Sequence, residues 1–222
     1  MTRVHRLLTV LLLSAAAVAG LAFAVSAIWG DEYGEPVRPW TDGSVHGPWR
    51  SVFDGHGANT GFTNGLALSP KPARQPDETH AGLIVSTRQY GDMSLQARMR
   101  TVAQLRTPTP NPWEVPWLVW AYTDPDHFYY LILKPNGWEL GKRDPAYPGG
   151  QRFLATAAEE FPVGDWSDVK VVQRGAHLDV SVDGKGLVSY DDEERPYPSG
   201  SIGAYTEDAQ AVFSDIAVEP TQ

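Results

Sequence analysis

The feature that most limits the possible folds is a series of short segments in which apolar and polar residues alternate. Residues 94–102 show the pattern clearly, because Leu95, Ala97 and Met99 share one face and the polar residues between them share the other. An alternation of period two is typical of a half-buried strand. About a dozen such segments lie between residues 50 and 218, and no stretch shows a convincing helical repeat. The chain is therefore predicted to be all-β.

Turn residues separate these segments. Asp183-Gly184 divides residues 178–182 from residues 186–190, and Arg174-Gly175 precedes the first of them. Asp-Gly is a strong hairpin signal, because both of its residues must adopt positive φ in the tightest turns. The chain also has 21 glycines and 18 prolines. Regular strands with such turns predict an antiparallel two-sheet sandwich rather than βαβ units.

The N-terminus differs from the rest of the chain. Arg3 and Arg6 precede an apolar run from Leu7 to Val25, and small residues follow, so residues 1–27 are interpreted as a secretory signal peptide. An uncleaved membrane anchor is the alternative, because the apolar run is long enough to span a bilayer. Both place the protein outside the cytoplasm, secreted or in the cell envelope. Residues 28–47 are interpreted as a linker, and residues 48–220 as the β-sandwich domain.

Composition excludes several kinds of function. A formal charge of -9 argues against a nucleic-acid partner, which needs a basic surface. With no cysteine, the chain has no disulfide, thiolate metal site or cysteine nucleophile. It also lacks Gly-x-Ser-x-Gly, His-x-x-x-His and the Glu-x-Asp-x-x-Glu pattern of jelly-roll glucanases. No catalytic residue is predicted.

Five motifs carry a family resemblance. Residues 118–130 place Asp124-Pro125-Asp126 between two aromatic strands, and Gly164-Asp165-Trp166, Val182-Asp183-Gly184, Gly200-Ser201-Ile202-Gly203 and Phe213-Ser214-Asp215-Ile216 follow. In this order they resemble the concanavalin A-like lectin/glucanase jelly rolls, specifically the laminin-G-like and 3-keto-disaccharide-hydrolase-like branch. The resemblance covers roughly residues 50–218 and implies a concanavalin A-like jelly roll. It leaves function open, because this fold hosts lectins, hydrolases and binding modules. Where the family often has an arginine, this chain has Ala121.

Nine aromatic residues fall between Trp113 and Tyr147. Alternation divides them between two faces, one that fills the core and one that is exposed and able to stack on sugar rings. Trp120 is assigned to the core. The predicted ligand-binding residues are three exposed rings with three polar partners: Trp117, Tyr129, Trp138, Glu139, Lys142 and Arg143.

The resemblance also implies a structural calcium ion. Many jelly rolls of this superfamily hold one between an acidic residue on the last strand and groups near the start of the domain. The corresponding residues here are Asp215 and Asp54, although the metal aspartate of the family most often occupies the position of Ser214.

Taken together, these features favour a secreted, non-catalytic carbohydrate-binding module whose partner is a polysaccharide or cell-envelope glycan. Contact with a membrane is expected only through an uncleaved N-terminal segment. A carbohydrate-active hydrolase on the same fold and a laminin-G-like protein adhesion module remain as alternatives.

Overall fold

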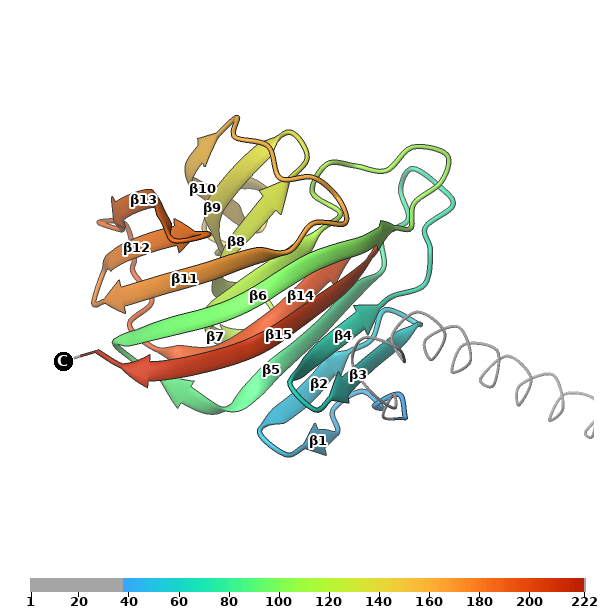
Figure 1. Cartoon of the computed structure of the whole chain (residues 1–222), viewed down its shortest axis with the longest axis horizontal. Helices are drawn as coiled ribbons and strands as arrows, with labels where there is room; N and C mark the ends of the chain where they lie inside the picture. Colours follow the sequence, from blue (N-terminus) through green and yellow to red (C-terminus); the bar gives the residue numbers. More distant parts are fainter. Residues whose placement is uncertain (1–37, 222) are drawn as a thin grey trace, which may run out of the picture.

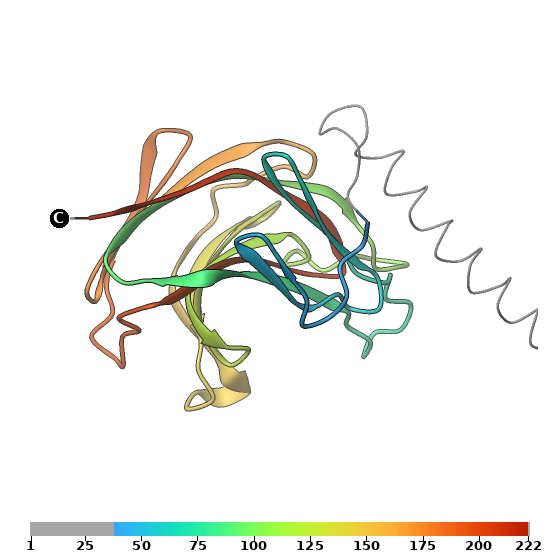
Figure 2. The same cartoon turned by 90° about the horizontal axis from the view of Figure 1, so that it is seen from below.

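The computed structural model describes residues 38–221, whose strands form two antiparallel sheets stacked as separate layers (Figures 1 and 2). The eight-stranded sheet has the order β1 (Val45–His46), β2 (Trp49–Phe53), β5 (Ala81–Tyr90), β14 (Gly200–Glu207), β7 (Pro116–Asp124), β8 (His127–Lys134), β9 (Gly137–Arg143) and β10 (Gln151–Ala157). The seven-stranded sheet has the order β13 (Lys185–Asp191), β12 (His177–Val182), β11 (Ser167–Arg174), β6 (Met93–Gln104), β15 (Ala209–Pro220), β4 (Gly65–Ser69) and β3 (Ala58–Phe62). The prediction of an all-β, two-sheet sandwich is confirmed.

The main core lies between the inner faces of the two sheets. Leu66 and Leu95 of the seven-stranded sheet and Leu118 and Trp120 of the eight-stranded sheet belong to one buried cluster. The predicted alternation in β6 is confirmed, because Leu95, its neighbours two residues away and Thr101 are all buried. Trp120 is fully buried, as expected for a core residue.

The predicted hairpins are present in the seven-stranded sheet. Strands β11, β12 and β13 form an antiparallel meander, and the turn between β12 and β13 has positive φ at Asp183 (51°) and Gly184 (75°). Strand β15 bends at a bulge, where its pairing with β6 shifts between Ser214 and Ala217 and Asp215 has a φ of 52°. Aspartate is one of the few residues that tolerate this left-handed conformation.

The segment interpreted as a linker, residues 28–47, differs from that prediction where the structure describes it. Trp40 is buried in the main core, and its backbone N–H donates to the carbonyl of Asn59 at 2.8 Å. Residues 45–46 form β1, the edge of the eight-stranded sheet. Residues 38–47 therefore belong to the sandwich, because burial of the Trp40 indole anchors them to it.

The described residues contain no α-helix; a single 3₁₀ turn spans Pro148–Gly150. Among residues 38–221 no helix is long and apolar enough to cross a membrane. The expected signal peptide or anchor, residues 1–27, lies outside the described part of the chain, as do residues 28–37 of the expected linker.

Candidate functional site

The outer face of the eight-stranded sheet, which points away from the other sheet, carries a second apolar cluster. Its members are Leu83, Val85, Val115, Trp117, Val119, Tyr122, Phe128, Tyr130 and Ile132. Strand pairing brings the rings together, because Tyr205 of β14 lies opposite Trp117 of β7, and Val119 lies opposite Tyr130 of β8. The Trp117 ring centroid is 4.6 Å from that of Tyr130 and 5.2 Å from that of Tyr205. The result is an aromatic layer that covers the aliphatic side chains of the sheet.

Two tyrosine–glutamate pairs border this layer. The Tyr130 hydroxyl donates to Oε1 of Glu139 at 2.7 Å, and the Tyr205 hydroxyl donates to Oε1 of Glu207 at 2.5 Å. The Nε2 of Gln151 donates to the Tyr130 hydroxyl, also at 2.5 Å. The two phenols therefore orient two carboxylates on the same face of the sheet.

Arg143 of β9 lies on the same face of the sheet as the two pairs. Burial raises the pKa of Tyr130, Tyr205 and Glu207, and the positive charge of Arg143 opposes that rise at all three. The guanidinium is thus within electrostatic reach of both pairs. Its side chain is 32% exposed, and its ion pair with Asp126 is long, at 3.8 Å. Arg143 can therefore still donate hydrogen bonds to a ligand. We call this group, namely Trp117, Tyr130, Tyr205, Glu139, Glu207, Arg143 and Gln151, the outer-face site.

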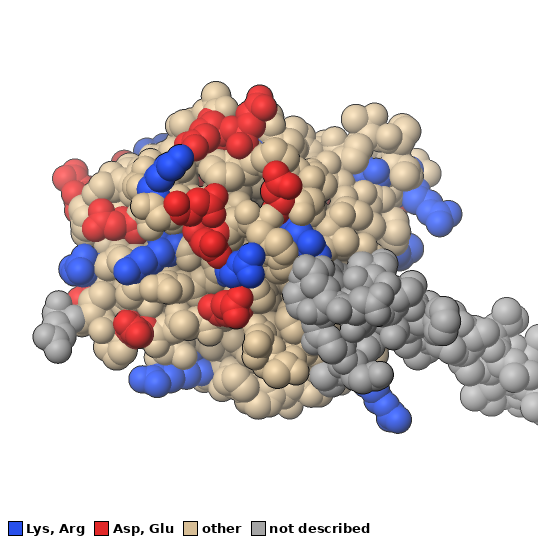
Figure 3. All heavy atoms as spheres, in the orientation of Figure 1, with Lys and Arg blue, Asp and Glu red and all other residues tan. Residues whose placement is uncertain are grey.

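The opposite side of the molecule is different in character. Figure 3 views the seven-stranded sheet, where acidic and basic side chains intermingle. Arg98 is 2.9 Å from Asp168, and both Arg98 and Arg100 lie 4.8 Å from the ring of Trp166. Because the charges there are paired and the indole is covered by guanidinium groups, this face offers less to a ligand than the outer-face site does.

Comparison with known proteins identifies the family. Residues 37–219 match the family model of the 3-keto-alpha-glucoside-1,2-lyase-like domain. The chain belongs to this family. The match begins at residue 37, before the expected domain boundary, in agreement with the buried position of Trp40.

Solved structures similar to this 3-keto-alpha-glucoside-1,2-lyase-like domain include the carbohydrate-binding module CBM66 from Bacillus subtilis. The two are 15% identical, with a TM-score of 0.61, over 82% of this chain and 99% of that chain. A Bacillus subtilis protein with a galectin-like fold is also 15% identical, with a TM-score of 0.53, over 77% and 88% of the two chains. These likenesses confirm the expected jelly-roll fold. Comparison with curated proteins gives no match.

The six predicted ligand-binding residues are divided between the two faces of the sheet. Trp117, Glu139 and Arg143 belong to the outer-face site. The prediction that Tyr129 and Trp138 are exposed is wrong, because both are buried in the main core. Trp117 is also only 5% exposed, since neighbouring rings cover it. The error lies in the choice of face for β8 and β9: adjacent residues such as Trp138 and Glu139 cannot share a face of a strand.

Lys142 was predicted to bind the ligand, but it is buried and stabilises the fold instead. Its side chain is fully buried on the inner side of β9, and its Nζ lies 2.7 Å from Oδ2 of Asp192. The same Nζ also donates to the carbonyl of Glu194, and the Tyr129 hydroxyl donates to Asp192 at 2.5 Å. These bonds hold the loop after β13 against the sheet. Burial and Asp192 together raise the pKa of Tyr129.

Sequence reasoning missed Tyr130, Tyr205, Glu207 and Gln151. Tyr205 and Glu207 follow the Gly200–Gly203 motif at alternate positions of β14, so their shared face could have been found from alternation. The position of Tyr205 opposite Trp117 could not have been found, because it depends on which strands are neighbours in the sheet. Ala121, at the position where the family often has an arginine, is buried in the main core.

The two predicted calcium ligands are not brought together. The backbone N–H of Asp215 bonds the carbonyl of Asn64, just before β4, whereas the turn of Asp54 packs against Pro70, just after β4. Asn64 and Pro70 are six residue steps apart along β4, about 20 Å at 3.3 Å per residue, so one ion cannot be shared. Within residues 38–221 no group of three or more histidine, aspartate or glutamate side chains is placed to hold a metal ion. Calcium binding at Asp215 or Asp54 alone stays a prediction.

Proposed function

We propose that the protein is an exported glycan-binding β-sandwich whose ligand lies on the outer-face site. The observation that carries this proposal is that the 32% exposed guanidinium of Arg143 and the tyrosine-bound carboxyl group of Glu207 lie on the same face of the sheet as an aromatic layer. Such polar groups can bind sugar hydroxyls in both donor and acceptor roles. The similarity to a carbohydrate-binding module supports the same ligand class, and the apolar run in residues 7–25 supports export.

The environment of Glu139 favours binding over two-carboxylate glycoside hydrolysis. Its Oε1 accepts a hydrogen bond from Tyr130 and its Oε2 is 3.0 Å from Nζ of Lys134, so both oxygens already have partners. Glu207 is on β14, and β7 and β8 lie between that strand and β9. A glycosidase needs two carboxyl groups that both reach the glycosidic bond.

Family membership favours a second candidate function, elimination on a 3-keto-α-glucoside. Such a reaction needs a base that removes the proton on the carbon next to the keto group, while the glycosidic oxygen leaves with the electrons of its bond. Glu207 has the chemistry of such a base, because burial raises its pKa and the Tyr205 hydroxyl orients it. Incubation with a 3-keto-α-glucoside tests this candidate: Glu207→Gln should abolish release of the leaving sugar, and no release by the unmodified protein would eliminate the lyase reaction.

The binding proposal is tested on a glycan array with Arg143→Ala and a matched control, Arg152→Ala. Arg152 lies on the neighbouring strand β10, opposite Lys142, and therefore points away from the outer-face site. Loss of charge-assisted hydrogen bonds from Arg143 should weaken binding about tenfold or more, while Arg152→Ala binds like the unmodified protein. Equal binding by all three proteins would contradict the proposal.

A further inference from the structure

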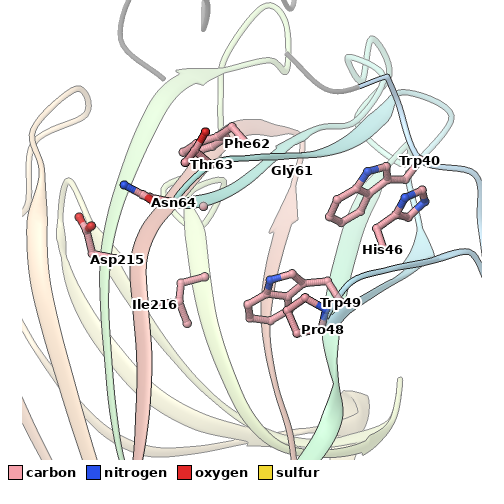
Figure 4. A pocket seen from close by; sticks show the side chains of 11 residues that line it. Trp40, His46, Pro48, Trp49, Gly61, Phe62, Thr63, Asn64, Asp215 and Ile216 are labelled. Carbon is pink, nitrogen blue, oxygen red and sulfur yellow. The ribbon is translucent and has the colours of Figure 1, made fainter. Parts of the chain in front are cut away.

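A cavity lies at the end of the sandwich where the edges of the two sheets meet. It has a volume of about 660 Å³ and is bounded by β1 and β2 of one sheet and by β3, β4 and the bulge of β15 of the other (Figure 4). We call it the edge pocket. Its size falls within the range of small-molecule sites, and it shares no residue with the outer-face site.

One wall of the edge pocket is aromatic and held in place. The rings of Trp40 and His46 stack, with centroids 4.5 Å apart and planes 4° from parallel. The Trp40 indole packs directly on Gly61, where a Cβ atom would lie 2.5 Å from the ring, so only glycine leaves room for it. Nε2 of His46 is 2.8 Å from the Ser44 hydroxyl. Trp49 lies beside this stack and is only partly buried, so its ring is the part of the aromatic wall that a ligand can reach (Figure 4).

The facing wall is polar. Asn64 and Asp215 lie there, across the pocket from Trp40 and Trp49 (Figure 4). The Asp215 carboxylate receives one hydrogen bond from Ser214 at 3.1 Å, and Arg98 is 3.9 Å away. Its side chain is 55% exposed. The carboxylate therefore keeps free acceptor positions, and the exposed Asn64 amide can both donate and accept.

From these two walls we infer that the edge pocket binds a neutral oligosaccharide. A sugar ring has an apolar C–H face that matches the aromatic wall and a hydroxyl edge that matches Asn64 and Asp215. Among the described residues that line the edge pocket, Asp215 alone is an Asp, Glu, Lys or Arg, so the edge pocket itself disfavours an anionic sugar unit.

A neighbouring cavity favours an oligosaccharide over a monosaccharide as the ligand. This smaller cavity, about 290 Å³ in volume, shares Phe62, Thr63, Asn64 and Asp215 with the edge pocket and continues toward Arg98 and Trp166. A sugar bound between Trp49 and Asp215 thus has room for a linked unit to continue along the surface.

The test compares Trp49→Ala and Asn64→Ala with the unmodified protein on an array of neutral oligosaccharides. Val45→Ala is the matched control, because Val45 is an exposed residue next to His46 and is not part of the pocket. Both Trp49→Ala and Asn64→Ala should bind at least one oligosaccharide about tenfold or more weakly than the unmodified protein does. Val45→Ala should bind that oligosaccharide as the unmodified protein does. Melting curves show whether Trp49→Ala still folds. If Trp49→Ala does not fold, Asn64→Ala alone decides the test, because Asn64 is exposed and its loss should not affect folding.

Unchanged binding of every neutral oligosaccharide by folded Asn64→Ala would overturn the inference, as would a lack of any such binding by the unmodified protein. Asn64→Ala reports on the edge pocket and Arg143→Ala reports on the outer-face site, so the two proposals fail separately whenever the unmodified protein binds a glycan. Failure of the outer-face site appears in Arg143→Ala, which leaves the edge pocket intact.

Discussion

At the residue scale, Trp138 and Glu139 show that adjacent residues of one strand lie on opposite faces of the sheet. Trp138 is buried in the main core and Glu139 bonds Tyr130 on the outer face. Trp138→Ala and Trp120→Ala should each therefore lower the free energy of unfolding by about 3–5 kcal/mol, because each removes a buried ring and leaves a cavity. Urea denaturation measures this, with the exposed Trp113→Ala as the control. A Trp138→Ala protein as stable as the unmodified one would show that the face assigned to β9 is wrong.

The buried ion pair between Lys142 and Asp192 makes a second residue-level prediction. Asp192→Ala leaves the Lys142 ammonium buried without its carboxylate, which should cost about 3–5 kcal/mol of unfolding free energy. The adjacent, exposed Glu193→Ala should change it by no more than about 0.5 kcal/mol. Equal stability of the two variants in chemical denaturation would mean that the pair does not anchor the loop.

At the scale of elements, the bulge of β15 accounts for an aspartate at position 215 through its backbone conformation. Asp215 has a φ of 52°, so Asp215→Val should destabilise by about 1–2 kcal/mol, whereas Asp215→Gly should be nearly neutral. Melting curves of the two variants measure this difference in stability, and melting curves with and without a chelator test for a bound metal ion. If Asp215 instead binds calcium, chelation will lower the melting temperature of the unmodified protein, and Asp215→Asn will remove that sensitivity.

The same scale shows what could be predicted from the sequence. The β11–β13 meander was predictable, because the Asp183-Gly184 turn and the alternating burial of β11 are local signals. The orientation of β8 was not, because Tyr129 and Tyr130 are both fully buried. Where both faces of a sheet are covered, alternation no longer distinguishes core from surface. The outer-face site was therefore predicted only in part. The edge pocket was not predicted at all, since Trp40 and Asp215 line the same pocket only because two sheet edges pack together.

At the scale of the whole molecule, Glu207 should affect stability as a function of pH. Burial raises its pKa above the ordinary 4.5, so the folded protein keeps a proton that the unfolded chain has lost. The free energy of unfolding contributed by this group therefore falls as the pH rises from the unfolded to the folded pKa. Glu207→Gln does not titrate, so its stability relative to the unmodified protein should rise over this interval. Urea denaturation between about pH 4 and about pH 8 tests this; a constant difference would contradict it.

The central claim for the whole molecule is that a glycan binds the outer face of the eight-stranded sheet. It is tested by NMR, in a titration of isotope-labelled protein with the glycan whose binding Arg143→Ala weakens most on the array. We expect the largest chemical-shift changes in β8, β9 and β14, centred on Tyr130, Arg143 and Glu207, and the loss of these changes in Arg143→Ala. Shift changes confined to the seven-stranded sheet would contradict it.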